Sequence, residues 1–191
     1  METKTYNNFF HNRTLLITGG AGFIGSTLAN TLISLGAHVR ILDDFSTGHK
    51  SNVQHLDAEV FEGSILDETM LRKSISGCDC VFHLAAMVSV PASVDNPTRC
   101  FNINTKGTEF VLHLASEEGV RRVVFAASSA AYGPHAALPS NETMRPDPAS
   151  PYAESKIAGE EAVRLCATST ETDAVSLRYF NIFGSGQDPH S

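Results

Sequence analysis

Tyr152 and Lys156 stand four residues apart in the segment SPYAESK. On a helix this spacing places both side chains on one face. A tyrosine with an ordinary pKa of ~10 is a poor base at neutral pH, but a positive charge about 5 Å away stabilises its phenolate by roughly 3 kcal/mol at an effective dielectric of about 20. For an isolated pair of this kind, a solvated helix surface is a better explanation than a catalytic site. A catalytic role for Tyr152 and Lys156 therefore depends on the neighbouring residues.

Three glycines, Gly19, Gly22 and Gly25, follow an apolar run and open a helical pattern in LLITGGAGFIGS. Gly19 and Gly22 allow a sharp turn in which a pyrophosphate approaches the backbone and the amide-rich end of the helix, and Gly25 allows helix and strand to pack closely. Asp43 ends the next predicted strand, where a carboxylate accepts hydrogen bonds from ribose hydroxyls and repels a 2′-phosphate, and Asp44 strengthens that repulsion. An ordinary tight turn explains a glycine triplet alone, but the strand, helix and acid together predict an NAD site that disfavours NADP.

Two serines, Ser128 and Ser129, lie in AASSAAYG, just beyond a predicted strand. Ligands of open α/β sheets bind at the carboxyl ends of the strands. The Pro-rich connection GPHAALPSNETMRPDPASP is too long for an ordinary loop and leads directly into the Tyr152 helix, which predicts a functional loop. We therefore predict that Tyr152 takes a proton from an alcohol as hydride leaves its carbon for NAD, with Lys156 and the oxidised cofactor lowering the pKa of Tyr152 and Ser128 bonding the same oxygen.

The elements that must position these groups alternate between short β-branched runs and longer helical patterns. Runs such as VFHLAA and RVVFAA are apolar on both faces, as in parallel strands covered by helices. The pattern predicts an α/β fold with a doubly wound parallel sheet, here a Rossmann fold, in which 1–13 are an N-terminal extension and 14–191 an NAD-binding domain. The predicted strands are Thr14–Thr18, Val39–Asp43, Glu59–Glu62, Cys80–Leu84, Arg122–Ala127 and Val175–Phe180, and the predicted helices are Phe23–Leu35, Asp67–Ser76, Thr98–Glu118 and Ser150–Ala167.

Composition narrows the possible partners. The 191 residues carry a net charge of −7 with no basic run, which argues against nucleic-acid binding. No segment has the length of a membrane span or the apolar core of a signal peptide, so we expect a cytoplasmic protein without membrane contact. The histidines show no metal-ligand spacing, and we expect no metal site, reduced structural cysteines and a buried, hydrogen-bonded core histidine at His83.

The order of several motifs resembles that of the extended short-chain dehydrogenases acting on nucleotide sugars, UDP-sugar 4-epimerases above all. These motifs are TGGAGFIGS, LDDFSTG, VFHLAA, NTKGT, SSAAYG, PYAESK and RYFNIFG. The resemblance implies that Phe23 and Ile24 contact the pyrophosphate, that Asp43 binds the adenosine ribose and Lys156 the nicotinamide ribose, and that backbone at Phe180 meets the nicotinamide. Further cofactor contacts that it implies are Asp44, Phe45, Ser46, Thr47, Gly48, Ser64, Ile65, Leu84, Ala85, Ala86, Asn104 and Tyr152. It implies a UDP-sugar substrate contacted by Ser89, Ser128, Ser129, Tyr152 and Asn181, and a homodimer formed through the helices 98–118 and 150–167.

The chain departs from this family pattern at a few positions. Asp44 stands where the family often has Asn, and Ser64 replaces an Asp that usually contacts adenine, so we expect weaker NAD binding than is typical. Dehydratases and uronate decarboxylases of the family usually carry an acid just before Tyr-Gly, whereas 129–133 reads SAAYG, which favours epimerisation.

The chain is shorter than the resemblance implies. It stops where the resemblance would continue for a further domain, so we expect most of the sugar-binding part to be absent. The sequence leaves open whether the chain is a fragment of an epimerase, belongs to a dehydratase or decarboxylase of the same family, or is an NAD-binding module without turnover.

Overall fold

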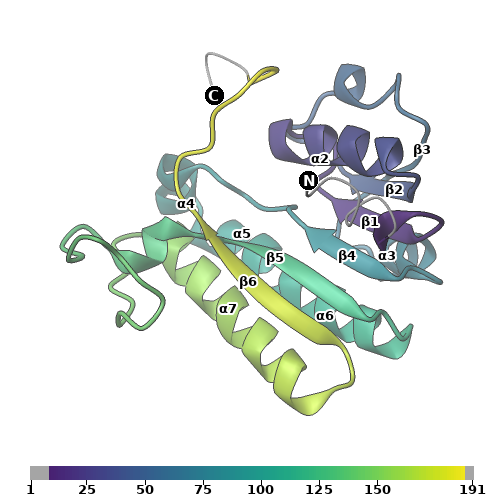
Figure 1. Ribbon diagram of the computed structural model, residues 1–191. Coiled ribbons are helices and arrows are strands. Elements are labelled where there is room, and N and C mark those ends of the chain that lie inside the picture. Colours follow the sequence, from purple (N-terminus) through teal and green to yellow (C-terminus); the bar gives the residue numbers. More distant parts are fainter. Residues whose placement is uncertain (1–8, 188–191) are drawn as a thin grey trace.

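A six-stranded, wholly parallel sheet runs through the molecule in the order β3-β2-β1-β4-β5-β6 (Figure 1). The structure is a computed structural model that describes residues 9–187. This order, with β1 and β4 at the centre, is that of a doubly wound dinucleotide-binding sheet, so the predicted Rossmann fold is confirmed. The strands are β1 (Thr14–Thr18), β2 (His38–Asp43), β3 (Ala58–Glu62), β4 (Cys80–His83), β5 (Arg122–Ser128) and β6 (Asp173–Tyr179).

Helices cover the two faces of the sheet unequally (Figure 1). α2 packs on β1 and β2 on one face, while α3, α6 and α7 share a core with the other face. The helices are α2 (Phe23–Ser34), α3 (Glu68–Ile75), α4 (Val90–Asp95), α5 (Pro97–Phe101), α6 (Gly107–Glu117) and α7 (Pro151–Ser169), with a π turn η2 (Asn102–Lys106) and short 3₁₀ turns η1 (Lys50–Asn52) and η3 (Ser129–Tyr132).

Side-chain caps begin the helices that carry or support the site. Asp67 accepts a hydrogen bond from the Met70 amide at 3.1 Å, and Ser150 accepts one from the Ala153 amide at 3.1 Å. Pro151 then occupies the first turn of α7, where its missing N–H costs no hydrogen bond. These caps place the start of α7, and with it Tyr152, at a defined point.

The expected single helix Thr98–Glu118 is interrupted. It consists of α5, the π turn η2 and α6 in succession, and a separate helix α4 that was not predicted precedes it. α4 has only 6 residues, too few for a periodic pattern, and it begins at the cap Ser89 and ends at Asn96, whose side chain caps α5 through the Arg99 amide at 3.0 Å. The other predicted elements exist, with ends displaced by one or two residues, and Phe180 lies just outside β6.

One face of the sheet is covered by α2 at one end only. Ile17, Phe82, Val124 and Val175 are neighbours in register across β1, β4, β5 and β6. Ile17 is fully buried under α2, whereas Val175 is 40% exposed. Within residues 9–187, the β5–β6 part of this face therefore presents apolar side chains to solvent.

The predicted N-terminal extension lies only partly inside the described residues. Its residues 1–8 fall outside them, while Phe10 packs against the core beneath α2. Among the described helices, none is both long and apolar enough to cross a bilayer. The expected cytoplasmic location stays a prediction.

Candidate active site

The glycine turn between β1 and α2 is closed by backbone contacts. Gly19 has a φ of 70°, and a Cβ there would lie 2.7 Å from the amide nitrogen of Ala85. Gly22 is the N-cap of α2 and provides no side-chain cap, which leaves the first amides of the helix available to an anion. A Cβ on Gly25 would clash with the Gly19 carbonyl oxygen. Gly25 therefore allows α2 to pack against the glycine turn, and not against the strand as predicted.

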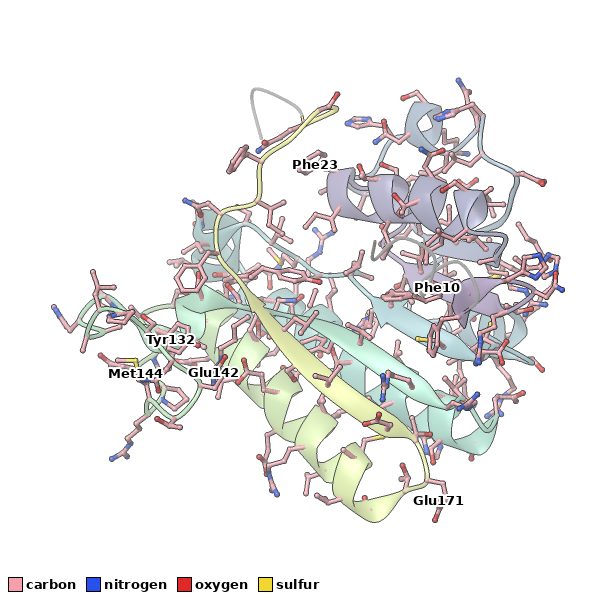
Figure 2. The ribbon with its side chains drawn as sticks, in the orientation of Figure 1. Phe10, Phe23, Tyr132, Glu142, Met144 and Glu171 are labelled. Carbon is pink, nitrogen blue, oxygen red and sulfur yellow. The ribbon has the colours of Figure 1, made fainter. Side chains whose placement is uncertain are left out.

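Phe23 and Ile24 form the first turn of α2, as the predicted pyrophosphate contacts require. Both are half-buried, and Phe23 projects from the end of the helix toward the C-terminal segment (Figure 2). A Cβ on Gly184 would lie 3.5 Å from the Phe23 ring. The C-terminal segment therefore passes close to the tip of the Phe23 ring.

Asp43 at the end of β2 fastens two loops. Its Oδ2 accepts a hydrogen bond from the Ala21 amide at 2.8 Å, and its Oδ1 accepts one from the Phe45 amide at 2.9 Å. Burial raises the pKa of this carboxyl group, and the two amide bonds act in the opposite direction. Each oxygen keeps a second lone pair, so Asp43 can still accept hydrogen bonds from a ribose.

The loop that follows Asp43 is folded back onto the glycine turn. Phe45 has a φ of 54°, in the left-handed region that an aromatic residue rarely adopts. The Asp44 side chain accepts a hydrogen bond from the Ser46 amide at 2.9 Å, and a Cβ on Gly48 would lie 2.8 Å from that of Ala21. The exposed members of the predicted set in this loop are Asp44, Ser46 and Thr47.

Ser64 and Ile65 follow β3 in a short turn. The Ser64 hydroxyl accepts a hydrogen bond from the Leu66 amide at 3.2 Å. The Ile65 side chain is 4% exposed and packs into the core against Gly107. Any contact of Ile65 with a cofactor must therefore come from its backbone.

Leu84, Ala85 and Ala86 leave β4 without regular secondary structure and pass beside the glycine turn. Asn104, on the π turn, is buried, and its side chain bonds both backbone groups of Met87, accepting from the amide at 2.8 Å and donating to the carbonyl at 3.0 Å. These bonds make Asn104 a support for the 84–87 segment.

Tyr152, Lys156 and Ser128 are brought together where β5 ends against α7. The Lys156 ammonium lies 6.0 Å from the Tyr152 ring centroid and donates a hydrogen bond to the Ala126 carbonyl at 2.9 Å. Burial lowers the pKa of Lys156 to about 8. The Ser128 hydroxyl acts to lower the pKa of Tyr152. The predicted bond from Ser128 to the substrate oxygen stays a prediction.

The expected lowering of the Tyr152 pKa is not what this chain produces by itself. Burial raises the pKa of Tyr152, and the nearby Ser128 hydroxyl offsets only part of that rise. The ammonium of Lys156 is directed to the Ala126 carbonyl, which limits its effect on the phenol. A Tyr152 phenolate therefore needs positive charge beyond that of Lys156.

Comparison with known proteins identifies the family. The model of the NAD-dependent epimerase/dehydratase family matches residues 15–191. The chain belongs to this family. The membership confirms the resemblance drawn from the sequence motifs and assigns NAD as the cofactor, and the bare amides of α2, the clearance at Gly19 and the lone pairs of Asp43 fit that cofactor.

Individual relatives are longer than this chain. The UDP-glucose 4-epimerase of Mycolicibacterium smegmatis is 37% identical over 183 residues, covering 92% of this chain and 58% of that protein. The UDP-N-acetylglucosamine 4-epimerase from Methanobrevibacter ruminantium, solved with UDP-N-acetylmuramic acid, superposes with a TM-score of 0.89 at 35% identity, covering 95% of this chain and 59% of the other. An NAD-dependent NDP-hexosamine 5,6-dehydratase of tunicamycin biosynthesis superposes at 0.86 with 31% identity, covering 94% and 58%.

The remaining predicted residues lie after β5, at the start of α4 and after β6. Ser129 begins η3, directly after Ser128. Ser89 is exposed and caps α4, accepting a hydrogen bond from the Ala92 amide at 3.2 Å. Phe180 and Asn181 are exposed beyond the end of β6, and the Phe180 ring stacks on that of Tyr132 at a centroid distance of 6.1 Å.

The ion pair between Arg178 and Glu160 was not predicted from the sequence. Arg178 on β6 donates two hydrogen bonds to Glu160 on α7, at 2.8 and 2.7 Å, and both side chains are 16% exposed. The Arg178 guanidinium also lies 4.7 Å from the Tyr132 ring centroid. Glu160 follows Lys156 by four residues, so its position on the same helix face could have indicated it in the sequence.

The long loop after η3 closes on itself. The Asp147 amide donates a hydrogen bond to the Ala131 carbonyl at 3.0 Å, and Gly133, with a φ of 78°, leaves room for the Asp147 backbone. Figure 2 shows Tyr132 at the base of the loop that bears Glu142 and Met144.

Among residues 9–187, no group of three His, Cys, Asp or Glu side chains is arranged to hold a metal ion.

Proposed function

We propose that the full-length protein interconverts the C4 epimers of a UDP-sugar, UDP-glucose with UDP-galactose or their N-acetylated forms. The observation that carries this proposal is the convergence of Tyr152, Lys156 and Ser128 at the carboxyl end of β5. The similarity to UDP-glucose and UDP-N-acetylglucosamine 4-epimerases supports the substrate class.

Each residue has a separate task in this reaction. NAD, held by the glycine turn, the first amides of α2 and Asp43, would supply the hydride chemistry at C4. Tyr152 accepts the proton of the 4-hydroxyl through its phenolic oxygen and gives it back at the end. Ser128 donates a hydrogen bond to the same substrate oxygen, and Lys156 supplies positive charge near the Tyr152 ring and a donor for the nicotinamide ribose.

A dehydratase is the second candidate because a dehydratase is among the structural neighbours. Eliminating water from a ketosugar requires an acid or base near the carbon that loses it. The segment Ser129–Gly133 offers no carboxyl group, which favours epimerisation. An NAD-binding module without turnover is the third candidate, and detectable turnover of a UDP-sugar would exclude it.

The decisive experiment compares the full-length wild type with Tyr152→Phe. We expect NAD affinity to persist and epimer interconversion to fall by roughly 10²–10⁴-fold, because the variant keeps the ring and loses only the proton acceptor. The assay follows UDP-glucose, UDP-galactose and their N-acetylated counterparts by chromatography. Near wild-type interconversion by Tyr152→Phe contradicts the mechanism, and a 4-keto-6-deoxy product would favour the dehydratase.

Cofactor preference is a related proposal. Asp43 is fixed by two backbone amides, so its carboxylate cannot easily turn away from a 2′-phosphate. We expect tighter binding of NAD than of NADP in calorimetric titrations, and a smaller difference in Asp43→Asn, which keeps the shape but removes the charge. Equal affinities of the wild type for both cofactors would contradict the proposal.

We also propose a homodimer that pairs α6 and α7 with the same helices of a second copy. The groove between these helices is lined by Thr105, Glu109, Leu112, Ala158, Glu161, Ala162 and Leu165. Phe110 on α6 is 41% exposed and Leu165 on α7 is 50% exposed, which suits an apolar contact. Sedimentation should show a dimer in the wild type and in the control Ala137→Arg, and a monomer in Ala162→Arg; a wild-type monomer at micromolar concentration contradicts the proposal.

A further inference from the structure

His83 lies at the centre of a hydrogen-bonded chain that crosses the molecule beneath the glycine turn. The His83 ring is 1% exposed at the end of β4. Its Nδ1 lies 2.7 Å from the Thr18 hydroxyl on β1, and its Nε2 lies 2.9 Å from the Thr108 hydroxyl on α6. The predicted role of a buried, hydrogen-bonded core histidine is confirmed, but these partners give the residue a further task.

The direction of every bond in this chain follows from counting protons. The Thr108 hydroxyl donates its single proton to the Asn104 carbonyl at 2.7 Å, so it can only accept from His83 Nε2. Burial, reinforced by the charge of Lys156, lowers the pKa of His83 to about 3, so the ring is neutral and holds one proton. That proton is on Nε2, and Nδ1 accepts from the Thr18 hydroxyl.

The chain ends at groups that flank the glycine turn. The Thr18 hydroxyl accepts a hydrogen bond from the Ala85 amide at 3.3 Å, and the Ala85 backbone is the surface that Gly19 approaches. At the other end, the side chain of Asn104 holds Met87. Both ends of the irregular segment Leu84–Met87 are thus connected through His83.

The side-chain amide of Asn104, a separate group from the backbone carbonyl that accepts from Thr108, contacts the helix that bears Tyr152. Asn104 donates a hydrogen bond to the Ser155 hydroxyl at 3.0 Å, and that hydroxyl donates to the Tyr152 carbonyl at 2.7 Å. The bonds that run in one direction from the Ala85 amide through Thr18, His83 and Thr108 to the Asn104 carbonyl polarise one another and strengthen the set. A change at one member therefore alters groups that it does not touch.

We propose that His83, as the neutral Nε2–H tautomer, is a positioning residue that sets the segment Leu84–Met87 against the glycine turn and thereby determines NAD affinity. It does not touch the cofactor or the substrate. It acts through Thr18 on one side and through Thr108 and Asn104 on the other. Its effect on NAD is exerted by holding Ala85 and Met87 in place.

The test alters the chain at Thr108, on α6, and measures NAD binding rather than turnover. Thr108→Val removes the acceptor of His83 Nε2–H while keeping the shape of the side chain. We expect NAD affinity to fall roughly tenfold, as for one lost buried hydrogen bond, and Thr108→Ser to restore it. The matched control is Thr172→Val, which removes a buried hydroxyl that donates to the Val120 carbonyl at 2.9 Å, at the amino end of β6; we expect it to lower the unfolding midpoint and leave NAD affinity unchanged.

A spectroscopic measurement on the wild type keeps the proposal testable even if a variant does not fold. Two-bond ¹⁵N–¹H correlation of labelled histidines should show His83 as the Nε2–H tautomer, unchanged between pH 5 and pH 9. An Nδ1–H tautomer, titration of His83 within that range, or equal loss of NAD affinity in Thr108→Val and Thr172→Val would overturn the proposal. None of these measurements depends on epimerase activity, so they stand or fall separately from the proposed reaction.

Discussion

The buried charge of Lys156 lowers the stability of the folded chain. Its ammonium is buried, and its single hydrogen-bond acceptor in the described structure is the Ala126 carbonyl at 2.9 Å. Burial of the charge lowers the pKa from 10.5 to about 8. Below pH 8 the folded chain therefore contains a protonated lysine that would be better solvated in the unfolded chain.

The sign of the pH dependence follows from the two pKa values. Between about pH 8 and pH 10.5 the unfolded chain binds the Lys156 proton and the folded chain does not, so this residue makes stability rise with pH. We expect Lys156→Met to raise the free energy of unfolding at pH 7 by about 1–3 kcal/mol, and the gain to shrink as the pH approaches 10.5. Urea unfolding at pH 7 and pH 9.5 measures this, with the exposed Lys106→Met as control; a less stable Lys156→Met at pH 7 would contradict it.

Elements set by short-range chemistry were predictable, and those set by tertiary contact were not. β-branched apolar runs gave the six strands, and the caps Asp67 and Ser150 agree with the predicted starts of α3 and α7. The π turn η2 has no local sequence signature. It is associated with tertiary contacts, because the buried side chain of Asn104 within it bonds to Met87 and Ser155. The site followed the same division. Tyr152 and Lys156 were predictable from their spacing and Ser128 from its place after a strand, whereas the Thr18–His83–Thr108 chain joins residues up to 90 positions apart.

The junction of the glycine turn with α2 gives a prediction for an element. A Cβ on Gly25 would lie 2.6 Å from the Gly20 Cα, whereas a Cβ on Gly22 would lie 3.4 Å from the nearest atom, the Gly19 carbonyl oxygen. Gly25→Ala must therefore push α2 away from the turn, and we expect it to cost about 1–3 kcal/mol of stability. Gly22→Ala serves as the control, with a much smaller loss, and thermal unfolding distinguishes the two. Equal stabilities would mean that the helix can shift without cost.

At the scale of the whole molecule, the unequal covering of the sheet is the dominant feature. The row Ile17, Phe82, Val124 and Val175 begins under α2 and ends exposed on β6, where Leu177 is also 41% exposed. Figure 1 shows α6 and α7 on the opposite side of β5 and β6. The match covers 58% of its Mycolicibacterium smegmatis relative, so that relative has further residues outside the matched part.

This open face should make the 191-residue chain bind apolar ligands and itself. We expect the double variant Val175→Thr, Leu177→Thr to bind roughly half as much of the dye ANS and to self-associate less, because threonine suits a strand but presents a hydroxyl to solvent. Its free energy of unfolding should change little, by about 0.5 kcal/mol per site, since both side chains already contact water. The control is Val123→Thr on the covered face of β5, where the side chain is fully buried and a hydroxyl should cost about 1–3 kcal/mol. If the double variant bound as much dye as the wild type, the exposed surface would lie elsewhere, and a large loss of stability would show that β6 is covered in solution.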